Sequence, residues 1–304
     1  MICLISMMKK KTWMKKIKLI KKNIKLYLLI FLCFIPFRFF AQEENKEIIS
    51  LPVTGSYSIE MGATSVQATY LSPLTYSGSQ YGAVGSWSKA MPFNPENAVM
   101  QFDGGINFCS LLNPAQTARM VGLNANFSWD MSWRKKLPQN FQVTVGGGIG
   151  VKGGAYYLLR NSNNPVEAIV DLSLLISASA SKHFNIGRLP ILITDRVKIP
   201  SLGVFFCPEY GETYYEIYLG NHKGLAHCGW WGNNFQLDNL LSVTLDFGRT
   251  AMMVGYQLKV HDQWANNLNT KIITNSFVIG VIPQGIGLKK RSKINPTIID
   301  YAIY

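Results

Sequence analysis

The chain has few charged residues and, beyond its N-terminal segment, no long apolar run. Charged residues make up 15% of the 304 residues, which is low against the quarter that is usual in soluble domains. Beyond residue 41 no uninterrupted apolar stretch approaches the ~20 residues of a membrane-spanning helix. Because 48% of the residues are nonetheless apolar, apolar and polar residues have to alternate finely. This pattern is typical of a β-sheet with one apolar face.

The net charge of +13 does not indicate a nucleic-acid-binding protein. Residues 1–41 contain ten basic residues and no acidic one, which leaves 20 basic and 17 acidic residues in the remainder. The tail at 284–304 holds four of those basic residues, so the body of the chain is nearly neutral. Electrostatic capture of a nucleic acid needs a basic stripe. The sequence has none, and we expect no nucleic-acid partner.

The N-terminus is typical of a secretory signal. A lysine-rich stretch precedes the apolar segment 26–37, and Ala41 is followed by Gln42 and two glutamates. A basic region, a short apolar region and a final small residue are the parts of such a signal. The sequence therefore predicts a signal peptide at 1–41, a short periplasmic leader at 42–54 and secretion in a Gram-negative cell. An uncleaved membrane anchor is the alternative, although this apolar segment is short for one.

Period-two alternation continues through the rest of the chain. Its clearest example is 121–133, where apolar side chains at odd positions, such as Phe127, alternate with Gly, Asn, Ser and Asp. A segment of this length exceeds the ~5–6 residues of an average strand and suffices for a tilted transmembrane strand of ~9–11 residues. The predicted strands lie near 56–70, 78–90, 98–109, 119–133, 139–157, 165–183, 189–205, 237–248, 250–261 and 271–283.

These segments predict an antiparallel transmembrane β-barrel of about ten strands (8–12) over 55–283, followed by a basic C-terminal tail at 284–304. An even strand number allows the wall to close without a free edge. If the chain starts on the periplasmic side, the inner connections are short and the longest connection, 206–236, lies outside, as expected for such a barrel. A soluble β-sandwich is the structural alternative.

Three features of the sequence resemble outer-membrane β-barrel proteins of the Bacteroidetes. They are the basic signal ending in Ala41-Gln42, the segment 69–74 followed by Tyr76-Ser77-Gly78, and the block from Pro208-Glu209-Tyr210-Gly211 through Asn233-Asn234-Phe235. More narrowly, the chain is similar to an uncharacterised family among them, known as a domain of unknown function. The resemblance implies a barrel in the cell outer membrane, in contact with its lipid bilayer. It implies no catalytic residue.

The long connection 206–236 concentrates the candidate binding residues. Tyrosine and tryptophan are enriched at recognition surfaces. The candidates for contact with an extracellular small ligand are Tyr210, Tyr214, Tyr215, Trp230 and Trp231. Packing of these rings into a lid over the barrel mouth is the alternative.

Two cysteines in the same connection, Cys207 and Cys228, are candidates for a disulfide, because the periplasm is oxidising. Free thiols are the alternative. His222 and His227 lie nearby, but the connection has neither CxxC nor HExxH spacing. We therefore predict no metal site and no cofactor.

Two classes of function remain open. The class that we favour is a small barrel that binds or passes a ligand, or presents surface loops. The other is an outer-membrane enzyme, a hydrolase or acyltransferase acting on lipid or peptide. Its active site would be drawn from the lumen-facing residues Asp103, Asp130, Asp171, Asp246 and His261. No spacing among them identifies a catalytic group.

Overall fold

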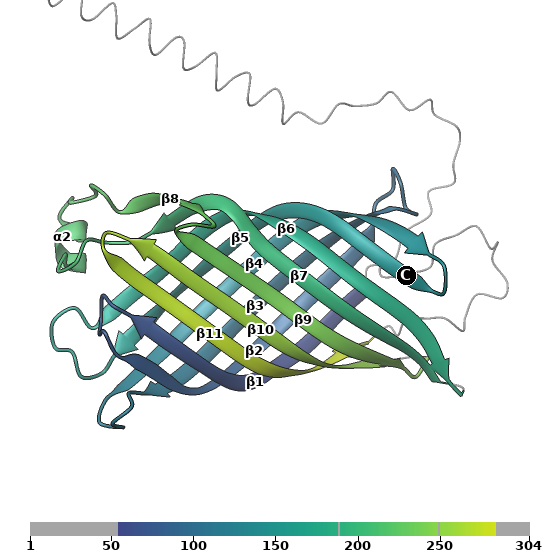
Figure 1. Cartoon of the computed structure of the whole chain (residues 1–304), viewed down its shortest axis with the longest axis horizontal. Helices are drawn as coiled ribbons and strands as arrows, with labels where there is room; N and C mark the ends of the chain where they lie inside the picture. The colour runs from purple at the N-terminus through teal and green to yellow at the C-terminus, as the bar shows by residue number, and fades with distance from the viewer. Residues whose placement is uncertain (1–53, 188, 249, 284–304) are drawn as a thin grey trace, which may run out of the picture. The chain divides into compact units, whose positions relative to one another are not determined.

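A closed antiparallel β-barrel is formed by the residues that the computed structural model describes, 54–187, 189–248 and 250–283 (Figure 1). The strands are β1 (Thr54–Ala68), β2 (Thr75–Ala90), β3 (Ala98–Leu112), β4 (Arg119–Leu137), β5 (Phe141–Leu158), β6 (Val166–Ile186), β7 (Leu189–Phe206), β8 (Ala226–Trp230), β9 (Asn234–Asp246), β10 (Ala251–Ala265) and β11 (Leu268–Ile282). The short helix α2 (Tyr214–Tyr218) precedes β8. The predicted signal peptide and the 284–304 tail lie outside the described residues.

None of the helices in the described part of the chain is long and apolar enough to cross a bilayer.

The wall has ten strand positions. Neighbouring strands pair in antiparallel register around the sheet, β6 pairs with β7, and β1 pairs with β11 to close it. β8 and β9 follow one another along β7, which pairs with β8 through Leu202–Phe206 and with β9 through Ile191–Lys198. They therefore occupy one position, and the prediction of about ten strands is confirmed.

Strict alternation separates the two faces of the wall. In β6, Val170, Leu172 and Leu174 are exposed on the outside, whereas Asp171 and Ser173 are buried in the lumen. Such a wall turns its apolar side chains outward, the reverse of a soluble barrel. Every backbone group in a closed wall can find a partner inside the protein, which is the condition for crossing hydrocarbon.

The glycine-rich segment of β5 has a packing role. Gly148 lies opposite Asp130 of β4, and a Cβ added to it would come within 1.9 Å of the Trp129 carbonyl oxygen. Only glycine lets the two strands approach so closely.

Unequal connections distinguish the two ends of the barrel (Figure 1). At the end where α2 lies, which we call the α2 end, the connections are 69–74, 113–118, 159–165, 207–225 and 266–267. At the opposite end they are 91–97, 138–140, 187–188 and 247–250. The longest connection is thus at the α2 end, as expected. The connections at that end are not all longer than those at the opposite end, since 266–267 is shorter than 91–97.

Two predicted connections are wrong in extent because the strands run on. The connection expected at 262–270 is only a two-residue turn, in which Asn266 and Asn267 have φ values of 51° and 58°. Two successive left-handed residues make the tight turn that matches the twist of a hairpin, and asparagine tolerates it. Likewise, β4 continues to Leu137, because Arg134 folds inward, so the turn expected to begin at Arg134 begins four residues later.

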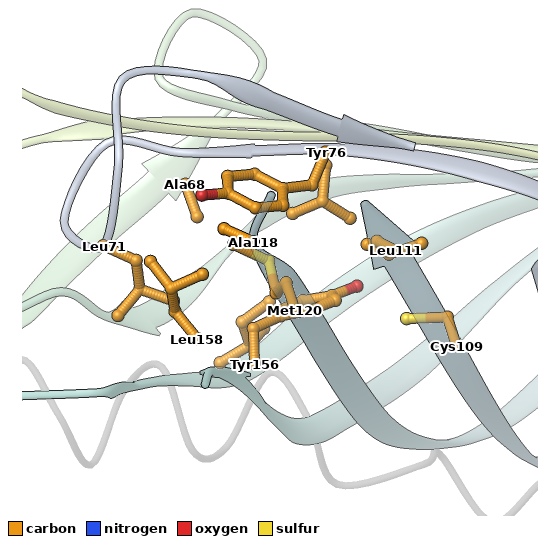
Figure 2. Close-up of a cluster of buried hydrophobic side chains, with 11 residues drawn as sticks. Ala68, Leu71, Tyr76, Cys109, Leu111, Ala118, Met120, Tyr156 and Leu158 are labelled. Atoms are coloured by element: carbon orange, nitrogen blue, oxygen red, sulfur yellow. The ribbon is translucent and has the colours of Figure 1, made fainter. Parts of the chain in front are cut away.

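Apolar side chains fill the lumen at the α2 end. We call this cluster the apolar plug; its buried members are Val66, Ala68, Leu71, Tyr76, Cys109, Leu111, Ala118, Met120, Tyr156, Leu158 and Ile169. Figure 2 shows these side chains converging from several strands and connections. Tyr70 packs against the plug and also against a second cluster containing Phe205 and Leu268.

Candidate functional site

An ion network crosses the lumen below the apolar plug. The Lys198 ammonium on β7 donates to Asp103 on β3 and, at 2.6 Å, to Asp130 on β4. Arg196 contacts Asp103 at 3.1 Å, and Lys198 also donates to Ser128. The four charges balance, and each carboxylate has hydroxyl or amide donors besides its cation. Such satisfaction is required for charges in a low-dielectric interior.

A second ion pair joins Glu60 of β1 to Lys259 of β10. The ammonium donates to the two carboxylate oxygens at 2.9 and 2.8 Å. Both β1 and β10 flank β11, so this pair holds two nearby strands together. The first network, by contrast, links β7 to β3 and β4, which the strand pairing alone does not connect.

Asp171 is the centre of a third polar group. It accepts from the Asn234 amide at 2.6 Å and from the Gln236 amide at 3.0 Å. Lys152, opposite Asp171 in the β5–β6 register, donates to the side-chain amide oxygen of Gln236 at 2.7 Å. Both charged groups therefore already have polar partners.

Two cavities remain between these groups. The central cavity, of about 150 Å³, lies between the polar groups and the apolar plug, and both contribute to its wall. The second, of about 140 Å³, has many serine and threonine side chains in its wall. We call it the hydroxyl cavity. Neither contains the aromatic residues of the 206–236 connection.

Polar groups without partners face the central cavity. Gln80 is 4% exposed and its amide nitrogen has no hydrogen-bond acceptor, and the Asn124 amide oxygen has no donor. His261 is 3% exposed, and neither ring nitrogen has a partner in hydrogen-bonding geometry. The Gln263 side chain lies close enough to interact with that ring, and its amide nitrogen donates to the Phe206 carbonyl at 3.2 Å. Buried polar groups normally find a partner.

The connection 207–225 is docked on the barrel mouth by tyrosines. The Tyr214 hydroxyl accepts from the Ala168 backbone N–H at 2.7 Å, and the Tyr70 hydroxyl donates to the Glu212 carbonyl at 2.5 Å. Thr213 and Glu216 form a capping box that starts the one-turn helix α2. Burial raises the pKa of Tyr214 to about 12, so its hydroxyl stays protonated.

Most of the chain matches one protein family. The model of a family described as Protein of unknown function (DUF3316) matches residues 26–292. The chain belongs to this family. The expectation that the chain belongs to an uncharacterised family is confirmed. An origin in the Bacteroidetes stays a prediction. Among curated proteins, none matches this DUF3316 member significantly.

Three solved structures are similar to this DUF3316 barrel in fold. The transport unit of the autotransporter AIDA-I from Escherichia coli has a TM-score of 0.39 and 6% identity, covering 82% of this chain and 94% of that one. The translocator domain of the autotransporter NalP from Neisseria meningitidis has a TM-score of 0.37 and 9% identity, covering 78% of this chain and 89% of that one. The β domain of the Bordetella autotransporter BrkA has a TM-score of 0.37 and 10% identity, covering 75% of this chain and 98% of that one. At these values nothing about function is carried over.

The five predicted binding aromatics do not converge. Tyr210 and Tyr215 are exposed, Tyr214 is committed to Ala168, and Trp231 donates to the Pro200 carbonyl at 2.8 Å. Trp230 pairs with Leu202 and lies on the outer face. The structure thus gives them separate positions, and none lines either cavity.

The expected disulfide is absent from the structure. Cys207 and Cys228 are both free, Cys207 buried and Cys228 exposed. Cys228 lies opposite the outward-facing Val204, whereas Cys207 follows Phe206 and contacts the Leu225 backbone on the lumen side. Two thiols on opposite faces of a wall cannot be bridged without moving the backbone.

The acidic candidates do face the lumen, but they make ion pairs and turn caps. Asp103 and Asp130 share Lys198, and Asp246 accepts from the Gly248 N–H at 2.7 Å. In the described part of the chain no group of three His, Cys, Asp or Glu side chains could hold a metal. Arg196, Lys198 and Glu60 were not among the residues predicted from the sequence. The alternation of Thr194, Arg196 and Lys198 on one face of β7 was the signal available for two of them.

Proposed function

We propose that this chain is an outer-membrane barrel that acts by binding, not by conducting, with its α2 end facing the cell exterior. The observation that carries the proposal is that two layers of side chains cross the lumen. The apolar plug occupies the α2 end, and the Lys198 network crosses the middle. A diffusion pore needs a continuous wet path, and these two layers interrupt it.

The outward-facing side chains support the location. Large apolar residues such as Leu123, Phe127, Val145 and Leu172 are about half exposed on the outside of the wall. A soluble monomer rarely exposes so extended an apolar surface. The secretory signal predicted at 1–41 is consistent with export to that membrane.

Conductance across a planar bilayer tests the proposal of a closed lumen. We expect the folded wild-type barrel to give no stepwise current. Insertion is checked in the same preparation by heat-modifiable gel migration, so that lack of current is not lack of insertion. A stable current from the inserted wild type would overturn the binding proposal and favour a pore.

Surface labelling tests the orientation. An epitope inserted beside Asn221, in the connection that contains α2, should be labelled on intact cells. The same epitope inserted between Gln139 and Asn140, in a turn at the opposite end, should be labelled only after the cells are opened. The reverse pattern would contradict the proposed orientation.

A further inference from the structure

We propose that the central cavity binds a small uncharged amphipathic molecule, an alcohol, phenol or amide, which enters from the membrane between β7 and β9. This proposal deepens the proposed function and rests on it. It is carried by the cavity's unsatisfied polar groups, its apolar side and a gap in the pairing of the wall beside it.

The unsatisfied polar groups define the charge of the ligand. The cations at the cavity are already engaged, Lys198 and Lys259 by carboxylates and Lys152 by Gln236. The capacity that remains is uncharged: the Gln80 amide nitrogen donates, the Asn124 amide oxygen accepts and the His261 ring can do either. A hydroxyl or amide complements this set directly, whereas a charged group would have to displace the amide partners of Lys152, Asp171 or Asp238.

The apolar side of the cavity defines the body of the ligand. Tyr156, Ile169, Leu175 and Ile272 contribute to its wall. A cavity of about 150 Å³ lined by apolar groups accommodates a molecule the size of benzene. Ordered water is the competing occupant, because water often satisfies buried polar groups. Water, however, gains nothing from the apolar side.

A gap in the backbone pairing adjoins the same cavity. β7 pairs with β9 up to Lys198 and resumes with β8 at Leu202, so residues 199–201 have no partner strand on that side. Pro200, which lacks an N–H, lies in the gap and lines the cavity. The register of β6 against β7 also shifts at Leu174/Leu175. The wall is therefore least tied together where the cavity meets it.

Trp231 covers this gap. Its indole N–H donates to the Pro200 carbonyl at 2.8 Å, across the interval where no strand pairing exists. The neighbouring Trp230 has the same side chain and is exposed on the outer face. The pair provides a matched comparison for testing the route.

Fluorine NMR of the barrel in lipid nanodiscs, with para-fluorobenzyl alcohol dissolved in the lipid, tests the site. We expect a saturable bound resonance. Para-fluorotoluene should bind about threefold to tenfold more weakly, the loss of one hydrogen bond to a buried group, and para-fluorobenzoate should bind more weakly than the alcohol. Lack of saturation by the alcohol, with water alone in the cavity, would overturn the proposal and leave the closed-lumen result unaffected.

Variants place the bound probe. Ser173→Leu fills the central cavity and should abolish the bound resonance, whereas Ser181→Leu, on the same strand but in the hydroxyl cavity, should preserve it. His261→Leu should reduce the preference for alcohol over toluene at least threefold. All three variants are first checked for heat-modifiable migration. Retained binding in folded Ser173→Leu, or an unchanged preference in His261→Leu, would contradict the assignment.

Exchange rates test the route. Trp231→Ala should accelerate exchange of the probe between lipid and cavity severalfold while its affinity changes less than about twofold. Trp230→Ala should change neither. Equal exchange in the two variants would overturn lateral entry.

Discussion

Replacing Lys198 by methionine should strongly destabilise the barrel. The side chain is buried and holds Asp103 and Asp130. Arg196 still neutralises Asp103 in the variant, but Asp130 keeps only the serine hydroxyls at 3.2 Å. Removing one partner of a buried ion pair typically costs ~3–5 kcal/mol, because the other charge is left uncompensated. We expect a loss of this size in the free energy of unfolding.

Urea unfolding from lipid vesicles measures that loss, and two further variants make it specific. Adding Asp130→Asn to Lys198→Met removes the stranded charge and should recover at least half of the stability. Lys271→Met breaks the exposed pair with Asp262, 3.8 Å apart, and should cost only ~0–1 kcal/mol. A loss at Lys198 no larger than that at Lys271 would refute the reasoning that the network is buried and coupled.

Two more predictions concern the α2 end. Maleimide at neutral pH should label Cys228 and spare Cys207, since Cys207 is buried and burial raises its pKa to about 12; mass mapping of the labelled peptides checks this, and equal labelling would contradict the placement. Tyr214→Phe leaves the Ala168 N–H without its acceptor, so hydrogen exchange at that amide should accelerate about fivefold or more, for a cost of ~1–3 kcal/mol, whereas Tyr215→Phe should have no effect.

The wall could be predicted from the sequence, because alternation is a local signal. In 121–133 the alternation predicts which side of the wall each side chain faces, and the burial pattern from Leu123 to Trp133 confirms this prediction. The ends of the strands were harder to predict. Asn266 and Asn267 are typical of a tight turn, yet the polar residues that flank them are equally typical of a longer loop. Five residues in α2 and five in β8 are too short for periodicity to reveal.

The lumen could not be predicted, because its contacts join strands that are not neighbours in the wall. Asp103 and Lys198 meet from β3 and β7, and Glu60 and Lys259 from β1 and β10. Which lumenal residues face one another depends on strand tilt and stagger, and neither is written in local alternation. The aromatic candidates lie apart for a related reason: sequence proximity in a long connection does not make side chains converge.

A depth gradient on the outside of the wall tests the membrane location most directly. Phe127 lies near the middle of β4 and Trp133 near its end, and both point outward at 49% and 55% exposure. In a bilayer, Phe127→Arg should cost ~2–4 kcal/mol and Trp133→Arg only ~0–1 kcal/mol. Urea unfolding from lipid vesicles gives both values, and we predict that clear difference. Equal losses at the two positions would contradict a barrel embedded in the membrane.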